Sequence, residues 1–146
     1  MHHFLFIIHL LSATIWVGGH LLLSIAYLPP ALKSKDPEVI RGFEKKYEPI
    51  GIPALIILVV TGVMMAYRYG VSVSTWFRFE SQIESVVSIK LLLLFTTFAL
   101  AVHARFFIIP KLSTKTLGKM ALHIILITII GISMLILGST VRLGGI

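Results

Sequence analysis

Four long apolar runs, separated by short polar stretches, dominate the pattern of this chain. They cover residues 4–28, 50–69, 86–109 and 120–140. A run of about 20 apolar residues is long enough to cross the hydrocarbon core of a bilayer as a helix. A helix also satisfies its own backbone polar groups, as a lipid-exposed segment must. The pattern therefore predicts an all-α membrane protein with four transmembrane helices in an antiparallel up-down bundle.

The polar stretches contain signals for where helices begin and end. Asp36 followed by Pro37 is typical of an N-cap and a first helical position, and apolar residues then recur at helical spacing up to residue 47. This predicts a short amphipathic helix between the first two spans, on the cytoplasmic surface. Proline pairs at 29–30 and at 49 and 53 are expected to end the first span and open the second. Ser81 and Glu84 fit a capping box for the third.

Composition changes the picture in two ways. The chain is 57% hydrophobic and 13% charged, which is too apolar for a soluble domain, so residues 1–146 are predicted to form one integral membrane domain. The absence of cysteine excludes disulfides, iron–sulfur ligation and thiolate metal sites. The first run is too long for a signal-peptide core, so we interpret it as a retained span.

The net charge of +7 is distributed as membrane topology would predict, rather than as a nucleic-acid-binding surface. Eight basic residues lie in the first and third connections: Lys33, Lys35, Arg41, Lys45, Lys46, Lys111, Lys115 and Lys119. The positive-inside rule places these connections in the cytoplasm. Both termini would then face outward, which in a bacterial inner membrane is the periplasmic side.

Histidines within the spans are the candidate functional residues. His9 and His20 are eleven residues apart, which leaves only about 20° of net rotation, so they share a face with Trp16 between them. Counted from the middle of each span, His20, His103 and His123 lie at similar depth on three different helices. Polar side chains at membrane depth usually face a bundle interior or a site. The alternative is that each histidine only makes a structural hydrogen bond.

Imidazole ligands suit haem iron and copper. For a b-type haem, His20 and His103 are the best axial pair, Gly19 and Trp16 would border the macrocycle, and Arg105 and Arg142 would lie at the two rims. His123 would ligate instead, hydrogen-bond, or serve a second centre. His9 could hold an outer haem, with Met134 as the sixth ligand or with a ligand the sequence does not identify. The same histidines, or His9 with Met134, could instead bind Cu(I), although methionine in such a position is more often a packing residue.

Several stretches resemble the short, four-helix members of the CopD (copper resistance protein D) family. The matching segments are HLLSATIWVGGH at 9–20, YLPPALK at 27–33, FEKKYEPIGIPAL at 43–55, HARFFIIPKL at 103–112 and VRLGGI at 141–146. The spacing of His9 and Trp16, followed by Tyr27-Leu28-Pro29, also resembles the HemJ protoporphyrinogen oxidases, in which an arginine commonly follows the proline. Here Pro30 stands at that position. The first resemblance implies copper uptake or tolerance, and the second implies haem or porphyrin.

The sequence therefore leads to one hypothesis with alternatives. The hypothesis is a b-type haem protein of the membrane that transfers electrons, with a quinone or a periplasmic redox or copper protein as partner. The alternatives are a copper-binding or copper-transport protein, a porphyrin oxidase, and a structural subunit. Glycines at 18–19, 131 and 138 would permit a helix-packed homodimer.

Overall fold

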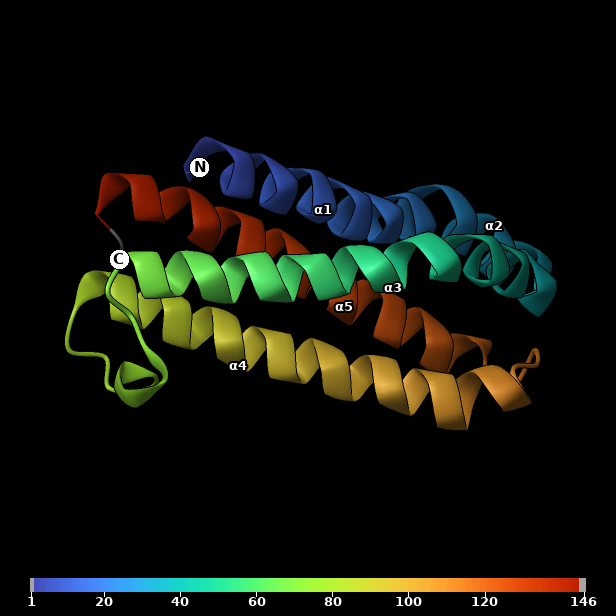
Figure 1. Ribbon diagram of the computed structural model, residues 1–146. Helices are drawn as coiled ribbons and strands as arrows, with labels where there is room; N and C mark the ends of the chain where they lie inside the picture. Colours follow the sequence, from blue (N-terminus) through green and yellow to red (C-terminus); the bar gives the residue numbers. More distant parts are fainter. Residues whose placement is uncertain (1, 145–146) are drawn as a thin grey trace.

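The computed structural model describes residues 2–144, and four long helical stretches lie side by side in it (Figure 1). Each is long and apolar enough to cross a membrane: His3–Ser34, Pro37–Arg68, Gln82–Lys111 and Leu117–Thr140. The described residues contain no β-strand. The predicted all-α, four-helix membrane protein is therefore confirmed. The start of the first stretch and the end of the last lie at the same end of the bundle (Figure 1).

The first stretch does not end at its proline pair. It runs as α1 (His2–Leu22), a π-helical turn (Leu23–Tyr27) and α2 (Leu28–Ser34). Pro29 and Pro30 occupy the first turn of α2, where an α-helix does not need their missing N–H groups. The stretch ends at Lys35, which adopts a left-handed conformation with φ 54°.

The second stretch, α3 (Pro37–Arg68), begins where the short helix was predicted to begin and continues through the predicted second span. The side chain of Asp36 accepts a hydrogen bond from the N–H of Glu38 at 2.9 Å, and Pro37 is the first helical residue. The prediction of a separate short helix before the span is wrong, because α3 passes through Pro49 and Pro53 without a break. At about 1.5 Å per residue, 32 residues extend well beyond a hydrocarbon core of about 30 Å.

The third stretch is capped as predicted. Ser81 accepts a hydrogen bond from the N–H of Glu84, and the carboxylate of Glu84 accepts one from the N–H of Ser81, which forms the capping box of α4 (Gln82–His103). A π-helical turn (Ala104–Ile108) and a short 3-10 turn (Ile109–Lys111) follow. The last long helix is α5 (Leu117–Thr140), which is followed by a 3-10 turn (Val141–Leu143).

Helix packing places α1 between α3 and α5, and α5 also packs against α4. The main apolar cluster lies at the end of the bundle where α2 joins α3, and it consists of Leu23, Leu28, Ala31, Ile40, Ala104, Ile108, Leu112, Leu117, Met120, Ala121 and Ile124. This cluster ties all four stretches together at that end. We call this end of the bundle the basic end, because the lysine-rich connections lie there.

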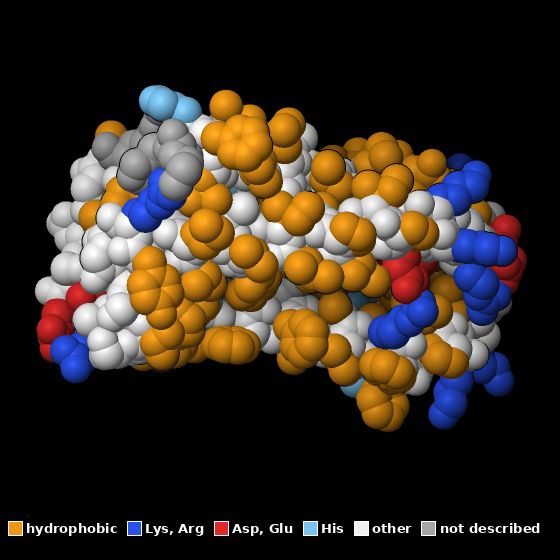
Figure 2. Space-filling view, in the orientation of Figure 1, with side chains coloured by type: hydrophobic (Ala, Val, Ile, Leu, Met, Phe, Trp, Pro, Cys, Tyr) orange, Lys and Arg blue, Asp and Glu red, His pale blue; other side chains and the backbone are white. Residues whose placement is uncertain are grey.

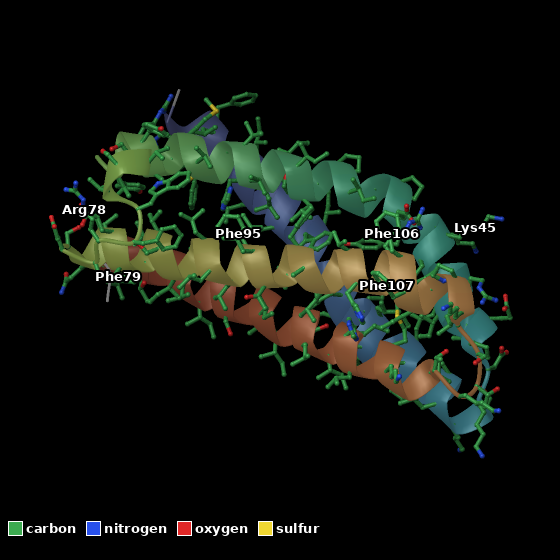
Figure 3. The ribbon with its side chains drawn as sticks, turned by 90° about the horizontal axis from the view of Figure 1, so that it is seen from below. Lys45, Arg78, Phe79, Phe95, Phe106 and Phe107 are labelled. Atoms are coloured by element: carbon green, nitrogen blue, oxygen red, sulfur yellow. The ribbon has the colours of Figure 1, made fainter. Side chains whose placement is uncertain are left out.

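Charged side chains gather at the two ends of the bundle, while hydrophobic side chains cover the middle of the face seen in Figure 2. Lys45 and Arg78 lie at opposite ends (Figure 3). Large apolar side chains such as Phe95 and Phe98 remain 57% and 61% exposed in the middle of α4. This distribution is that of a multi-pass protein whose middle contacts lipid.

Candidate functional site around the histidines

His20 is held in one orientation by its own helix. Its side chain lies on α1 and is only 9% exposed, and Nδ1 is 2.9 Å from the carbonyl oxygen of Trp16. A carbonyl oxygen can only accept a hydrogen bond, so Nδ1 carries the proton and donates it. In the neutral ring, Nε2 then keeps its lone pair.

Tyr47 of α3 closes the space beside His20. Its hydroxyl donates to the carbonyl oxygens of Ile15 at 3.0 Å and Trp16 at 3.1 Å. A Cβ atom placed on Gly19 would lie 2.2 Å from Cε2 of the ring, and one on Gly51 would lie 2.6 Å from Cε1. The space that we expected Gly19 to leave for a flat macrocycle is therefore filled by the phenol ring.

From the sequence we expected Tyr47 at the cytoplasmic rim of the site, and not against Gly19 and His20. The available signal was its spacing: Tyr47 and Gly51 are four residues apart, so the glycine lies beneath the ring on the same helix face. No pattern in the sequence connects this pair with Gly19 on α1. That contact depends on how the two helices pack.

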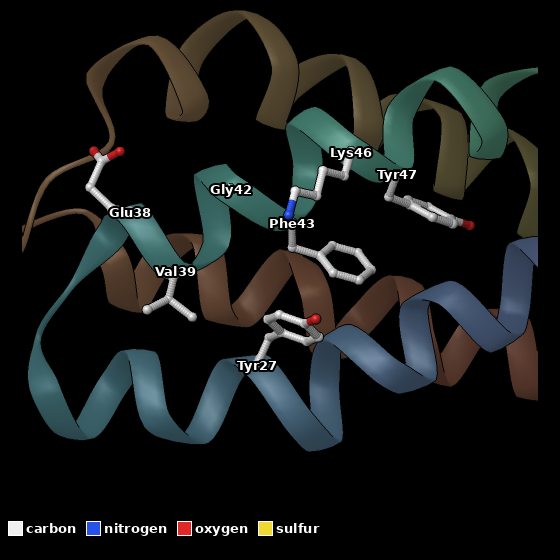
Figure 4. Close-up of a pocket in the computed structure, with 7 residues that line it drawn as sticks. All are labelled: Tyr27, Glu38, Val39, Gly42, Phe43, Lys46 and Tyr47. Atoms are coloured by element: carbon white, nitrogen blue, oxygen red, sulfur yellow. The ribbon is translucent and has the colours of Figure 1, made fainter.

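A row of aromatic rings leads from His20 to the basic end. Successive ring centroids are 4.5 Å apart for Trp16 and His20, 5.8 Å for His20 and Tyr47, 5.3 Å for Tyr47 and Phe43, and 4.8 Å for Phe43 and Tyr27. Phe43 and Tyr27 both line a groove of about 480 Å³ between α3 and the first stretch (Figure 4). This row fixes the His20 ring from both sides.

His103 and His123 contact each other directly. Nδ1 of His123 donates to the carbonyl oxygen of Lys119 at 2.9 Å, so Nε2 of the neutral His123 ring is an acceptor. Nδ1 of His103 lies 2.9 Å from that Nε2 and donates to it. The proton positions leave Nε2 of His103 with a free lone pair. Phe107 stacks on the His103 ring at 5.4 Å.

His9 is anchored to α3 nearer the other end of the bundle. Its Nδ1 lies 2.8 Å from Oγ1 of Thr61. The single hydroxyl proton of Thr61 goes to the carbonyl oxygen of Ile57 at 2.6 Å, so the hydroxyl accepts from Nδ1–H of His9. Gly62 lies close to the ring, since a Cβ there would be 3.3 Å from Cε1.

The predicted site residues are thus brought together only in part. His103 and His123 form a pair, and Trp16, Gly19 and His20 lie together with Tyr47. Among the described residues, no group of three His, Cys, Asp or Glu side chains is close enough to hold a metal ion. His20 has no contact with the histidine pair in the hydrogen bonds or ring contacts of the described part of the chain.

The remaining predicted residues lie apart from the histidines or outside the described side chains. Arg105 binds Glu48 of α3 with an N–O distance of 2.5 Å, beside a groove of about 450 Å³ at the basic end. Met134 is half-buried on α5. The prediction for Arg142 falls on a side chain that lies outside the described part of the structure.

Comparison with known protein families bears on this arrangement. The family model described as Copper resistance protein D matches residues 41–143. The chain belongs to the CopD family. The match covers α3, α4 and α5 and therefore includes Tyr47, His103 and His123. It begins after α1, so His9 and His20 lie outside it. No curated protein and no solved structure matches the chain significantly.

Membership of the CopD family identifies a membrane protein connected with copper resistance. The family description names copper and does not name haem.

Proposed function

We propose that this CopD protein binds Cu(I) within the membrane through the free Nε2 atoms of its histidines, with His20 and His103 as the principal ligands of separate copper ions. The observation that carries this proposal is a shared hydrogen-bond pattern. His9, His20, His103 and His123 all donate Nδ1–H to an acceptor inside the protein. A histidine that ligates a metal usually donates its other ring N–H in this way, which fixes the tautomer and the ring orientation.

The available ligand types also favour copper. The chain has no cysteine, and imidazole is a ligand that copper accepts at low coordination number. The described residues contain no three-ligand cluster, which argues against a Cys- or His-rich structural metal site. It does not argue against Cu(I), because Cu(I) can be held by few ligands. In this proposal copper is the cargo or substrate of the protein, and it is not a resident cofactor.

The distribution of basic residues supports one orientation of the protein in the membrane. We place the basic end, with its lysine-rich connections, in the cytoplasm and both chain ends on the periplasmic side of a bacterial inner membrane. His20, His103 and His123 then lie in the cytoplasmic half, and His9 lies in the periplasmic half. Copper bound at two levels could pass between a periplasmic partner and the cytoplasmic side.

Haem b remains the alternative for the same histidines, but the residues around His20 do not fit it as folded. The Tyr47 ring lies against Gly19, the Trp16 ring packs at 4.5 Å from His20, and no described contact brings His103 toward His20. A macrocycle would have to displace Tyr47 and break its two hydrogen bonds. We therefore derive no electron-transfer step through haem, and no feature of the site favours porphyrin oxidation.

The proposal is tested by competition between the protein and a chromophoric Cu(I) chelator. The full chain is reconstituted in lipid nanodiscs without oxygen and titrated with Cu(I), and the copper withheld from the chelator is measured. The expected result is tight binding that is lost or weakened at least tenfold in His20→Ala and His103→Ala. His3→Ala, at an exposed terminal position, is the matched control and should bind like the wild type. Equal binding by all four proteins, or none by the wild type, would refute the proposal.

A further inference from the structure

His103 differs from the other intramembrane histidines in its exposure. The His103 side chain is exposed at the end of α4, whereas His9 and His123 are half-buried and His20 is buried. Its ring lies nearly parallel to that of His123, edge to edge across their hydrogen bond with centroids 5.0 Å apart, and it stacks on Phe107 from the same stretch. His103 therefore presents a polar ring on the outer surface of the bundle, between α4 and α5.

The hydrogen bonds of the pair leave one ring nitrogen without a described partner. The carbonyl oxygen of Lys119 accepts from His123, and Nε2 of His123 accepts from Nδ1–H of His103. Nε2 of His103 makes no hydrogen bond within the described residues. A polar atom in contact with lipid is unfavourable, so such groups usually face another protein surface, water or a bound ion.

One chain offers this nitrogen without a described cluster of ligands around it. The Nε2 of His123 is already used as an acceptor, and no group of three His, Cys, Asp or Glu side chains among the described residues could hold a metal ion. A single imidazole nitrogen is too few for stable Cu(I) binding, which needs at least a second ligand. A ligand from outside the chain would complete the site.

A second copy of the chain would supply it at the correct depth. Copies inserted in the same orientation are related by a two-fold axis along the membrane normal, and such an axis brings identical residues together at the same depth. Only a residue on the outer surface can meet its own copy in this way, and His103 is such a residue. We infer that His103 and the same histidine of a second copy bind one Cu(I) between their Nε2 atoms. The inference rests on the copper binding proposed above.

The surroundings of His103 are compatible with this contact. Phe106 and Phe107 are 69% and 65% exposed, and they provide apolar side chains for helix packing. The charge of Arg105 is engaged by Glu48 of α3, which reduces repulsion between the two copies. By the metal–nitrogen distances of imidazole sites, the two Nε2 atoms would stand about 4 Å apart. Both rings bind as neutral ligands, so no proton or electron is transferred.

In this arrangement His123 is a positioning residue. Its Nε2 fixes the tautomer of His103 and aims the opposite nitrogen at the metal. Removal of such a partner typically weakens metal binding by about 10- to 100-fold. Substitution of His123 should therefore lower the copper affinity without changing the number of copper ions per dimer.

Native mass spectrometry of the full chain released from nanodiscs tests the inference, because it counts chains and copper ions together. With Cu(I) added, the wild type should give a species of two chains and one copper, and removal of copper should shift it toward single chains. His103→Ala and His103→Asn should both lose the copper-bound dimer, while His123→Ala should need about 10- to 100-fold more Cu(I) to form it. His103→Asn serves as the second variant because its shorter amide can still bond to His123.

Three results would overturn the inference in distinguishable ways. Wild-type chains that bind copper one to one as monomers would contradict the shared site but leave the proposed copper binding intact. Wild-type chains that bind no copper in any form would refute the proposed function and the shared site together. A copper-bound dimer that persists in both His103 variants would show that the two copies meet elsewhere. His3→Ala should behave like the wild type.

Discussion

The phenol ring of Tyr47 occupies the space that a side chain at Gly19 would need. Because Tyr47 lies on α3 and Gly19 on α1, the glycine is required for close approach of these two helices at the level of His20. The carbonyl oxygen of Trp16 accepts hydrogen bonds from both the Tyr47 hydroxyl and the His20 ring. The packing of α1 on α3 and the orientation of His20 are therefore parts of one arrangement.

Gly19→Ala should destabilise the protein, whereas Gly18→Ala should not. A Cβ at Gly19 would lie 2.2 Å from the Tyr47 ring, and the ring cannot move toward its own helix because Gly51 is also tightly covered. Nothing lies within 4 Å of a Cβ at Gly18. Overpacking typically costs about 1–3 kcal/mol. Thermal unfolding in detergent would measure the difference, and equal melting temperatures for the two variants would contradict this packing.

Tyr47→Phe should cost a smaller amount, about 0.5–1.5 kcal/mol, because it removes the hydroxyl but keeps the ring. The carbonyl oxygen of Trp16 keeps its bond from His20, so it is not left unsatisfied. The loss should also shift the fluorescence of Trp16. Tyr67→Phe, at an exposed tyrosine, is the control. A Tyr47→Phe protein as stable as this control would show that the hydroxyl contributes nothing.

The ion pair between Arg105 and Glu48 should make only a small contribution to stability. The two side chains are 55% and 31% exposed, and exposed pairs typically contribute less than about 1 kcal/mol. Arg105→Glu should lower the melting temperature slightly, and the reversed pair Arg105→Glu with Glu48→Arg should recover part of the loss. Lys33→Glu, at an exposed lysine of α2, controls for the change in net charge. No recovery in the reversed pair would contradict a direct interaction.

The proposed orientation can be tested with single cysteines, because the natural chain has none. Ser74→Cys, in the connection between α3 and α4, should react in intact cells with a thiol reagent that cannot cross the inner membrane. Lys35→Cys and Lys115→Cys, at the basic end, should react only after the membrane is disrupted. The opposite labelling pattern would place the basic end outside.

Local signals predicted much of the fold. Asp36 with Pro37, and Ser81 with Glu84, mark helix starts through contacts between residues close in the chain, so the sequence is sufficient to identify them. The depth counted from span midpoints also placed His103 and His123 within about one helical turn of each other in height, and the two rings are in contact.

Features that depend on packing between helices were not predictable in this way. Pro49 and Pro53 predicted a new helix start, yet α3 continues through both, because neighbouring helices can compensate for backbone groups that proline leaves unpaired. The role of Tyr47 depends on glycines on two helices. Depth alone likewise could not show that the His20 ring turns toward α3 and packs on Tyr47.

The most direct test of the account is the metal content of the purified protein. The full chain is expressed with both copper and haem precursors supplied, purified without oxygen, and examined by elemental analysis and absorption spectroscopy. Copper binding by the histidines predicts copper without iron and no Soret band, with the copper lost in the His20→Ala, His103→Ala double variant. Iron with a Soret band that disappears in that variant would contradict the copper account and establish haem as the ligand of these histidines.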